Sequence, residues 1–258
     1  MVDIHSTAIV SSKAKIGKNV KVGPFAIIHD DVEIGDDCII DSHAVLYNGA
    51  RLAERVHIFQ GVSVANVPQD LKFGNETTYF YIGSDTQIRE FVTLHRGTHA
   101  TGKSSVGKNC LIMAYCHVAH DCIVGNNVIL ANGVQLAGHC ELEDYVIVGG
   151  LSGIHQFSKV GAHAMISFQA KINADVPPFL MVGGAPARYE GINKIGLRRR
   201  GFTPEELEAI KETYRIFYLS GFLFSEAKEK ISSELGHIEV VKQVLNFMAK
   251  SNRSIIRK

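Results

Sequence analysis

The chain lacks several features that would point to large classes of protein. It has no tryptophan, only six prolines and five cysteines in 258 residues. The cysteines form no Cys-x-x-Cys pair, and an odd number of thiols without a secretory signal argues against a disulfide framework. No stretch approaches the ~18–20 consecutive apolar residues of a membrane span. We therefore expect a cytoplasmic protein with reduced thiols and no transmembrane segment.

The sequence also lacks an excess of charge of either sign. Its 27 Lys and Arg residues against 26 Asp and Glu residues give a net charge of +1. Proteins that hold nucleic acid through its phosphates need a basic surface field, so nucleic acid is not an expected partner. Apolar residues make up 46% of the chain and charged residues 21%, which is enough apolar material for a sizeable core in one or two domains.

A period of six residues organises the first two thirds of the chain. When every sixth residue is read from Ile4 to Ile172, 26 of 29 positions carry Val, Ile or Leu, the exceptions being Asp70, Glu76 and Ala100. This period fits neither an α-helix nor a simple strand alternation, and it is the signature of a parallel β-helix. With three hexads in a triangular coil, the pattern predicts a mainly β solenoid of roughly 8 to 9 stacked coils.

Small residues dominate the position two before the aliphatic, and they are expected to share the narrow interior. All five cysteines fall on this phase: Cys38, Cys110, Cys116, Cys122 and Cys140. We interpret them as compact core residues, because a metal site or a thiol nucleophile would need a polar, convergent setting. Glycine often follows the aliphatic, as at Gly35, Gly83 and Gly125, and we expect these glycines to supply positive φ at the corners.

The domain organisation follows from where the repeat is interrupted and where it ends. Residues 1–176 are predicted to form the β-helix, with polar, glycine-bearing interruptions near 66–78 and 97–104 that should loop out. Residues 177–200 are interpreted as a linker that carries an arginine segment. Residues 201–258 are expected to form a C-terminal helical domain.

Three helices are predicted in that last part. The segment Thr203-Pro204-Glu205-Glu206 has an N-cap, a proline in the first turn and a reciprocal acidic partner, so a helix is expected from there to Leu219. Ser225 and Gly236 bracket a second helical stretch, and residues 238–250 support a third.

Histidines form the strongest candidate site. His117, His120, His139 and His155 lie off both inward phases, and subtraction of whole coils brings the last three near one corner of successive coils. Three imidazoles could hold a zinc-type ion with one position open to water. Alternatively, one histidine could act as a general base beside a carboxylate, which the pair His120-Asp121 would supply. The residues alone leave both chemistries open.

Taken together, these residues resemble the UDP-N-acetylglucosamine acyltransferases that begin lipid A biosynthesis. The resemblance covers essentially the full chain, and its motifs are PQDLKF (68–73), IREFVTLHRGT (88–98), HVAHDCIVGN (117–126), LAGH (136–139), HQF (155–157), DVPPF (175–179) and GINKIGLRRRGF (191–202). It implies a left-handed parallel β-helix with a C-terminal helical domain, and a homotrimer with active sites between neighbouring solenoids. It also implies transfer of a 3-hydroxyacyl chain from acyl carrier protein to the 3-hydroxyl of UDP-N-acetylglucosamine, with neither metal nor cofactor.

The resemblance also implies roles for individual residues. His120 matches the general base, Asp121 the carboxylate that orients it, and Gly138 the glycine whose backbone N–H serves as oxyanion donor. Contacts to the sugar, the acyl hydroxyl or the thioester arm are implied for Asp70, Lys72, His117, His139, His155 and Gln156. Contacts to the nucleotide end are implied for Asn193, Arg199 and Arg200. A basic surface for acidic acyl carrier protein is expected at Lys194, Arg198 and Lys228.

Two positions depart from the family pattern. Members that accept long acyl chains have a glycine at the position of Phe168, so a bulky side chain there predicts a shorter acyl group. Ile195 replaces an acidic residue found in some relatives, which leaves open any role at that position.

Three other readings compete with this one. The first is a metal-dependent hydratase of the γ-carbonic anhydrase type on the same solenoid, which would not explain GLRRRGF or the helical cap. The second is a non-catalytic scaffold, in which the histidines would be dispensable. The third is the later acyltransferase that acts on acylated glucosamine, which normally has an extra N-terminal domain, whereas here the repeat starts by Ile4.

Overall fold

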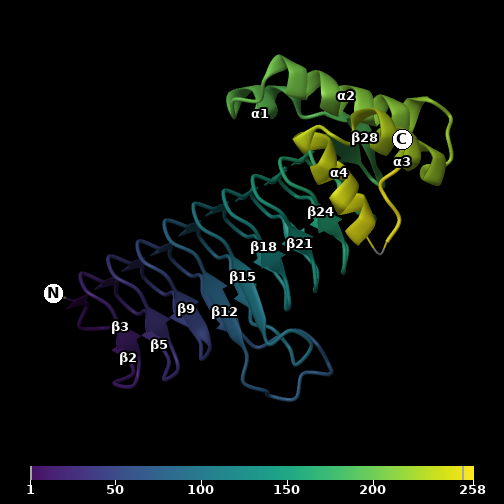
Figure 1. Cartoon of the computed structure of the whole chain (residues 1–258). Coiled ribbons are helices and arrows are strands. Elements are labelled where there is room, and N and C mark those ends of the chain that lie inside the picture. Colours follow the sequence, from purple (N-terminus) through teal and green to yellow (C-terminus); the bar gives the residue numbers. More distant parts are fainter. Residues whose placement is uncertain (1, 252) are drawn as a thin grey trace.

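The computed structural model describes residues 2–251 and 253–258. The chain winds into a left-handed parallel β-helix whose C-terminal end is covered by helices (Figure 1). Short strands alternate with tight corners, and each strand pairs with the strand one coil later. The predicted fold class is confirmed.

Three sheets form the faces of the triangular solenoid. The first sheet has the order β1 (Asp3–Ile4), β4 (Lys21–Val22), β7 (Ile39–Ile40), β10 (His57–Ile58), β13 (Gln87–Ile88), β16 (Leu111–Ile112), β19 (Ile129–Leu130), β22 (Ile147–Val148), β25 (Met165–Ile166), β27 (Leu180–Gly184) and β28 (Ala187–Ile192). The second has the order β2 (Ile9–Val10), β5 (Ile27–Ile28), β8 (Val45–Leu46), β11 (Ser63–Asn66), β14 (Thr93–His95), β17 (His117–Val118), β20 (Gln135–Leu136), β23 (Gly153–Ile154) and β26 (Lys171–Ile172). The third has the order β24 (Lys159–Val160), β21 (Glu141–Leu142), β18 (Ile123–Val124), β15 (Lys103–Val106), β12 (Tyr79–Ile82), β9 (Ala50–Leu52), β6 (Glu33–Ile34) and β3 (Lys15–Ile16).

The strand register follows the predicted coil length. His117 pairs with Gln135, and Gln135 pairs with Gly153, so partners are 18 residues apart. In the described part of the chain the second sheet has nine strands, in agreement with the predicted number of coils. Each coil therefore presents equivalent positions to the same face or corner as the coil before it.

The interior of the solenoid is filled by the two predicted inward phases. Aliphatics such as Ile40, Leu46 and Ile58 are fully buried, and all five cysteines are buried and free, as predicted. Ile4 is 44% exposed because it lies on the first coil, which no earlier coil covers. The core is thus a continuous column built one hexad at a time.

The role expected of the corner glycines is wrong. Positive φ occurs three residues after the aliphatic, mostly at non-glycine residues such as Asp121 (60°), His139 (60°) and Phe157 (66°), and not at Gly35, Gly83 or Gly125. The glycines are needed for space instead. A Cβ on Gly35 would lie 2.7 Å from the carbonyl carbon of Ala53, which belongs to the next coil.

The two interruptions of the repeat project as loops, as predicted. Residues 67–78 connect β11 to β12, and residues 96–102 connect β14 to β15. Both leave the solenoid beside β12 and β15 (Figure 1). Strand pairing continues across them, with Tyr79 opposite Lys103, so the stack itself is unbroken.

The expected linker at 177–200 is ordered into secondary structure. The strands β27 and β28 form an antiparallel hairpin that extends the first sheet, and the short helix α1 (Lys194–Arg199) follows. Short strands without the hexad phase carry no periodic signal, so the sequence pattern missed them. The division of the chain into separate domains stays a prediction.

The C-terminal helices largely follow the predicted bounds. Helix α2 (Pro204–Leu219) begins with the predicted capping box at Thr203, helix α3 (Phe224–Leu235) starts one residue before Ser225, and helix α4 (Glu239–Lys250) follows. The hydroxyl of Tyr214 donates to the carbonyl of Pro178 at 2.6 Å, which ties α2 to the end of the solenoid. None of the helices in the described part has the length and apolar character needed to cross a membrane.

Candidate active site

The corner between the second and third sheets carries most of the predicted site residues. It includes both projecting loops and the corner segments 119–122, 137–140 and 155–158. We call it the loop edge. The sequence prediction that His120, His139 and His155 lie at one corner of successive coils is confirmed, because each follows a strand of the second sheet and precedes one of the third.

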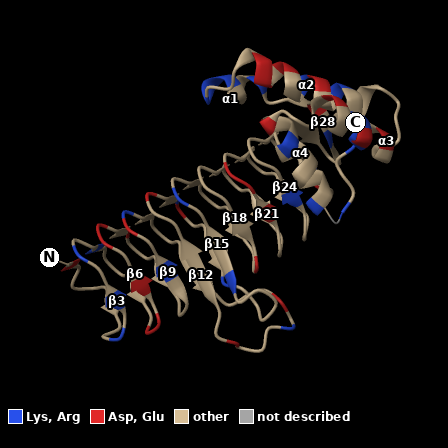
Figure 2. Ribbon diagram, viewed as in Figure 1, with Lys and Arg blue, Asp and Glu red and all other residues tan. Residues whose placement is uncertain are grey.

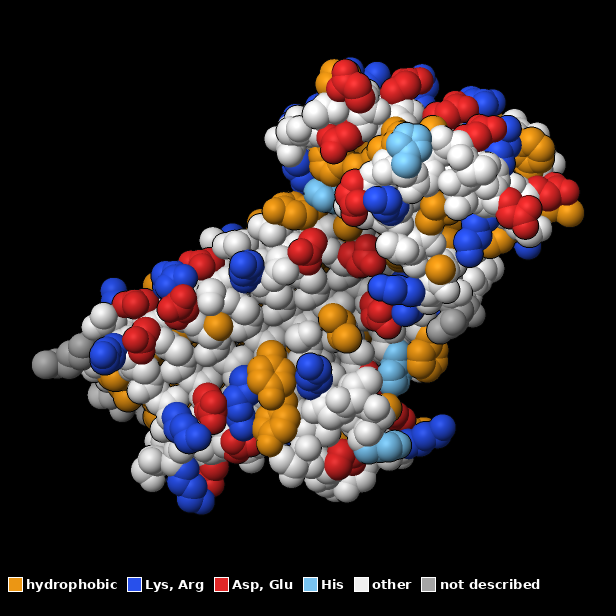
Figure 3. Space-filling model, in the orientation of Figure 1, with side chains coloured by type: hydrophobic (Ala, Val, Ile, Leu, Met, Phe, Trp, Pro, Cys, Tyr) orange, Lys and Arg blue, Asp and Glu red, His pale blue; other side chains and the backbone are white. Residues whose placement is uncertain are grey.

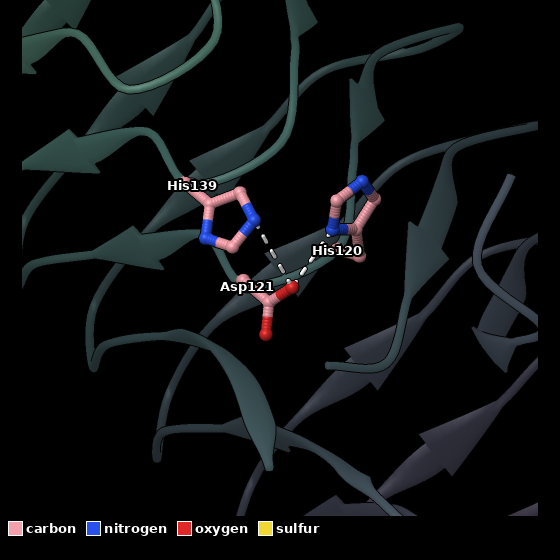
Figure 4. A group of neighbouring side chains, drawn as sticks. All are labelled: His120, Asp121 and His139. Carbon is pink, nitrogen blue, oxygen red and sulfur yellow. Dashed lines mark hydrogen bonds and ion pairs between the residues drawn. The ribbon is translucent and has the colours of Figure 1, made fainter. Parts of the chain in front are cut away.

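Asp121 lies at the centre of this edge and is in contact with two imidazoles (Figure 4). Its Oδ2 lies 2.8 Å from Nδ1 of His120 and 3.5 Å from Nε2 of His139. The two rings meet edge to face, with centroids 5.2 Å apart, and His139 stacks on Phe157. The Asp121 side chain is fully buried, whereas those of His120 and His139 are 12% and 21% exposed. The buried carboxylate thus contacts two histidines whose rings are partly exposed at the surface.

Hydrogen bonds keep Asp121 in its charged form. Burial alone would raise the pKa of its carboxyl, but donors on Thr101, His120 and Thr98 outweigh that effect and hold the pKa below its ordinary value of 3.8. An ionised carboxylate can only accept hydrogen bonds, so Nδ1 of His120 carries the proton in this pair. In the neutral imidazole the other ring nitrogen, Nε2, then has the lone pair.

Gly138 provides the space for the His120 ring. A Cβ at this position would lie 2.6 Å from Cε1 and 2.7 Å from Nε2 of His120, so no side chain fits there without moving the imidazole. Among the residues that the structure describes, none accepts a hydrogen bond from the N–H of Gly138. The N–H of Gly138 is thus left without a partner in the described structure.

Two further histidines extend the site onto the second sheet. His117 lies within 2.8 Å of the Thr93 hydroxyl through Nδ1, and its ring meets that of His95 edge to face at 4.7 Å. Burial, together with the charge of His120, lowers the pKa of His117. Burial and the neighbouring His117 and His120 lower that of His95 to about 4. Both are therefore neutral near pH 7.

The first projecting loop brings Asp70 toward this cluster. Burial and the charge of His120 lower the pKa of His139, whereas the charges of Asp121 and Asp70 oppose that shift. Oδ1 of Asp70 accepts the N–H of Lys72 at 3.0 Å. The Lys72 side chain is exposed to solvent.

His155 and Gln156 lie one coil beyond His139. His155 is exposed, and its Nδ1 is 3.1 Å from the carbonyl oxygen of Gln156, which also accepts a hydrogen bond from Arg253 at 2.8 Å. A groove of about 370 Å³ runs over the second sheet, lined by residues that include His117, Gln135 and His155. Phe168, which is 62% exposed, lies at the far corner of the same sheet. The groove thus lies between the histidines and Phe168.

The residues expected at the nucleotide end lie on a different edge. Arg200 places its guanidinium 5.3 Å from the ring centroid of Tyr145, at the corner between the third and first sheets. Asn193 is buried, caps α1 through Gly196 N–H, and donates to the carbonyl of His163 at 2.9 Å. Arg199 is exposed on α1. One copy of the chain therefore does not bring these three residues to His120.

Sequence reasoning missed the two hydroxyls that hold Asp121. Thr98 donates to it through both its N–H and its hydroxyl, and Thr101 donates its hydroxyl. Both residues come from the second projecting loop, whose return path cannot be read from a six-residue period. The sequence offered one indication: counting coils places this loop at the same corner as Asp121.

Comparisons with known proteins identify the family. A curated acyl-[acyl-carrier-protein]--UDP-N-acetylglucosamine O-acyltransferase of Thiobacillus denitrificans is 43% identical over the full length of both chains, and one of Myxococcus xanthus is also 43% identical over both full lengths. The chain belongs to the UDP-N-acetylglucosamine O-acyltransferase family. A family profile described as domain 2 of that enzyme matches residues 175–256, and the hexapeptide profile of bacterial transferases matches 13–48 and 103–138.

Solved structures of the family agree in fold over nearly the whole chain. The UDP-N-acetylglucosamine acyltransferase of Francisella novicida is 40% identical, with a TM-score of 0.97 over 99% of this chain and 94% of its own. The enzyme of Campylobacter jejuni is 33% identical, with a TM-score of 0.94 over 99% of this chain and all of its own.

Family membership removes the support for the hydratase alternative. Donor atoms of His120, Asp121 and His139 do lie within 4.8 Å of one another, as metal ligands would. Both oxygens of Asp121, however, already accept hydrogen bonds from the second loop. The arrangement of His120, Asp121 and His139 therefore resembles a histidine base supported by a hydrogen-bonded carboxylate more than a metal site with free ligand atoms.

Proposed function

We propose that the protein transfers a 3-hydroxyacyl group from acyl carrier protein to the 3-hydroxyl of UDP-N-acetylglucosamine, the first step of lipid A biosynthesis. The observation that carries this proposal is the orientation of His120, whose Nδ1 faces the buried carboxylate of Asp121 and whose Nε2 lies beside Gly138. A base of this kind suits a hydroxyl nucleophile, which must lose its proton as it attacks. Full-length relatives at 43% identity carry the name of that reaction.

In the proposed mechanism His120 acts first as base and then as acid. Nε2 takes the proton of the sugar 3-hydroxyl as the oxygen attacks the thioester carbonyl carbon. The resulting oxyanion accepts a hydrogen bond from the Gly138 N–H, which costs no reorganisation because that donor has no other partner in the described structure. When the C–S bond breaks, the imidazolium returns its proton to the leaving sulfur. Asp121 stabilises the imidazolium while it exists.

We further propose that the complete site lies between two copies of the chain in a homotrimer. The sugar, the acyl hydroxyl or the thioester arm would contact Asp70, Lys72, His139, His155 and Gln156, which lie along the loop edge with His120, and His117 on the adjoining second sheet. The nucleotide end would meet Asn193, Arg199 and Arg200 of a neighbouring copy. The separation of these two groups onto different edges of one solenoid favours that arrangement.

The acyl carrier protein would dock on the C-terminal part. Basic residues gather on α1 (Figure 2). A groove of about 280 Å³ between α1 and α2 is lined by Lys194 and Arg198, together with Lys211 and its ion-pair partner Glu208. Elsewhere on the face in view, charges of both signs are interspersed (Figure 3). A local basic surface can steer an acidic partner even at a net charge of +1. Lys228 is half-buried on α3 and remains part of this proposal.

We also propose that Phe168 limits acyl length. The groove over the second sheet leads from the histidines toward the corner that carries this ring, so a chain lying in it would end against Phe168. Replacement by glycine should shift the preference toward longer chains. Identical chain-length profiles for the wild type and Phe168→Gly would show that the acyl group lies elsewhere. We propose a cytoplasmic location, in keeping with five free thiols.

The experiment that tests the function is acyl transfer to UDP-N-acetylglucosamine from a ladder of 3-hydroxyacyl carrier proteins, with EDTA present. We expect the wild type to be active and His120→Ala to lose about 100- to 10,000-fold in rate. His5→Ala is a matched control, because His5 is exposed near the far end of the solenoid. No transfer at any chain length would overturn the substrate assignment. Full activity in His120→Ala would move the base to another histidine.

A further inference from the structure

Most of the hydrogen bonds to Asp121 come from the second projecting loop. Oδ1 accepts the Thr98 N–H at 3.0 Å and the Thr101 hydroxyl. Oδ2 accepts the Thr98 hydroxyl at 2.8 Å and Nδ1 of His120 at 2.8 Å. A carboxylate offers about four acceptor positions, so all of them are filled, and the loop fills every one except that of His120.

The protons of the two hydroxyls are available for this purpose. The Thr98 oxygen accepts the N–H of Ala100 at 3.2 Å, which leaves its own proton for Asp121. The Thr101 proton has two acceptors within reach, the Lys103 carbonyl and Oδ1 of Asp121. The anionic oxygen is the stronger acceptor, because a charged partner roughly doubles the strength of a hydrogen bond.

We propose that Thr98 and Thr101 are positioning residues for the acyl transfer, which hold Asp121 so that its last acceptor site fixes the imidazole of His120. With three donors from one loop, the carboxylate cannot rotate without breaking a buried hydrogen bond. The proton of His120 then stays on Nδ1, and Nε2 faces the substrate. This inference rests on the proposed role of His120 as the base.

The loop that carries the two threonines is itself fixed to the loop that carries Asp70. Glu76 Oε1 accepts the His99 N–H at 2.9 Å, and the Thr78 hydroxyl donates to the Gly97 carbonyl at 2.6 Å. The guanidinium of Arg96 lies 5.3 Å from the ring centroid of Phe73. The two projecting loops thus hold each other in place, and this fixes the positions of the Thr98 and Thr101 hydroxyls.

Other titratable groups surround the pair without replacing these donors. His139 Nε2 is 3.5 Å from Oδ2, and His117 and His95 contact each other on the second sheet. Asp70 acts on His139 from the first loop. A separate groove beside Asp121 on the third sheet is also lined by Glu141, Lys159, Asp175 and Arg253. In the structure as described, the only donors that lie within 3.0 Å of the carboxylate are the threonines and His120.

The kinetic test uses Thr98→Val and Thr101→Val, which remove a hydroxyl at nearly constant shape. We expect kcat to fall about 10- to 100-fold and KM for the sugar nucleotide to stay within about two-fold, the range set by one hydrogen bond to a charged group. The acidic limb of the kcat/KM profile should move up by about one pH unit, because a carboxylate with fewer donors holds the His120 proton more strongly.

Conservative and matched variants separate positioning from folding. Thr98→Ser and Thr101→Ser keep the hydroxyl and should restore both rate and pH profile. Thr77→Val, at an exposed threonine of the first loop, should change neither. A loss of rate that the serine variants share, or one without a shift of the acidic limb, would overturn the proposal.

A second readout does not depend on catalysis. NMR of protein labelled with ¹³C and ¹⁵N in histidine, with His120 assigned through His120→Gln, reports its tautomer and titration. We expect the Nδ1–H tautomer and a lower titration point in the wild type, and a higher titration point in both valine variants. If the wild type transfers no acyl group, the proposed function fails, yet this measurement still decides the role of the threonines. Unchanged His120 titration in both valine variants would refute it.

Discussion

Gly138→Ala is the sharpest test of the geometry around His120. The new Cβ would lie 2.6 Å from Cε1 and 2.7 Å from Nε2 of the imidazole. Non-bonded atoms of this kind settle about 3.5–4.0 Å apart, so the ring must move by about 1 Å. A misplacement of about 1 Å at a reacting group can cost about 100-fold in rate, and we expect kcat to fall by about that factor.

The fold should survive this change. Gly138 does not have positive φ, so alanine can adopt its backbone conformation without strain. The closest atoms to the new methyl belong to the His120 side chain, whose ring can move toward the surface. We therefore expect a melting temperature within a few degrees of the wild type, measured beside steady-state acyl transfer followed by mass spectrometry.

Ser12→Ala is the control for a small change away from the site. Ser12 is exposed between β2 and β3, near the far end of the solenoid. Its rate should stay within about three-fold of the wild type, since no reacting group is displaced. A wild-type rate in Gly138→Ala would refute the reasoning, because the imidazole would then not need the position that the structure gives it.

Three other predictions follow from local structure. Thr203→Ala removes the hydrogen bond from the Glu206 N–H at 3.2 Å and should cost about 1 kcal/mol of stability in chemical denaturation, whereas no change would show that the cap is redundant. Ellman's reagent should react with none of the five cysteines until the protein is unfolded, since all are buried and burial raises the pKa of Cys110 and Cys116 to about 11. Because the folded pKa of Asp121 lies below 3.8, its contribution to stability is present above that pH and is lost as pH falls through the folded value. The difference in unfolding free energy between the wild type and Asp121→Asn should therefore shrink only under acid, and a difference that disappears near neutral pH would contradict this sign.

The parts of the fold that repeat locally could be predicted from the sequence. Each hexad has its own pair of inward residues and its own corner, so an error in assigning one hexad does not shift the next. The common register of 18 residues then brings His120 and His139 together without knowledge of any loop. The helix start at Thr203 depends on four neighbouring residues and was equally accessible. Local rules were sufficient for both.

The parts that depend on contacts distant in sequence could not be predicted. The hairpin of β27 and β28 is stabilised by pairing with β25 and has no period of its own. We expected the glycines that follow the aliphatics to have positive φ. They are required instead because the neighbouring coil leaves no room for a side chain, as Ala53 does at Gly35. Thr98 reaches Asp121 across 23 residues of chain, and nothing in its local sequence indicates which carboxylate it will meet.

The loop edge explains how a uniform solenoid can hold one specialised carboxylate. Corner residues such as Asp121, His139 and Phe157 share a left-handed backbone conformation and stack on each other from coil to coil, so an aspartate there would ordinarily face solvent at one side. The second loop enters at this same corner and covers that side with Thr98 and Thr101. Without these donors the buried carboxylate could rotate, and it would no longer fix the orientation of the His120 ring. A loop inserted at any other corner would also leave the repeat intact, but it would not bring donors to Asp121, and His120 would lose its positioning carboxylate.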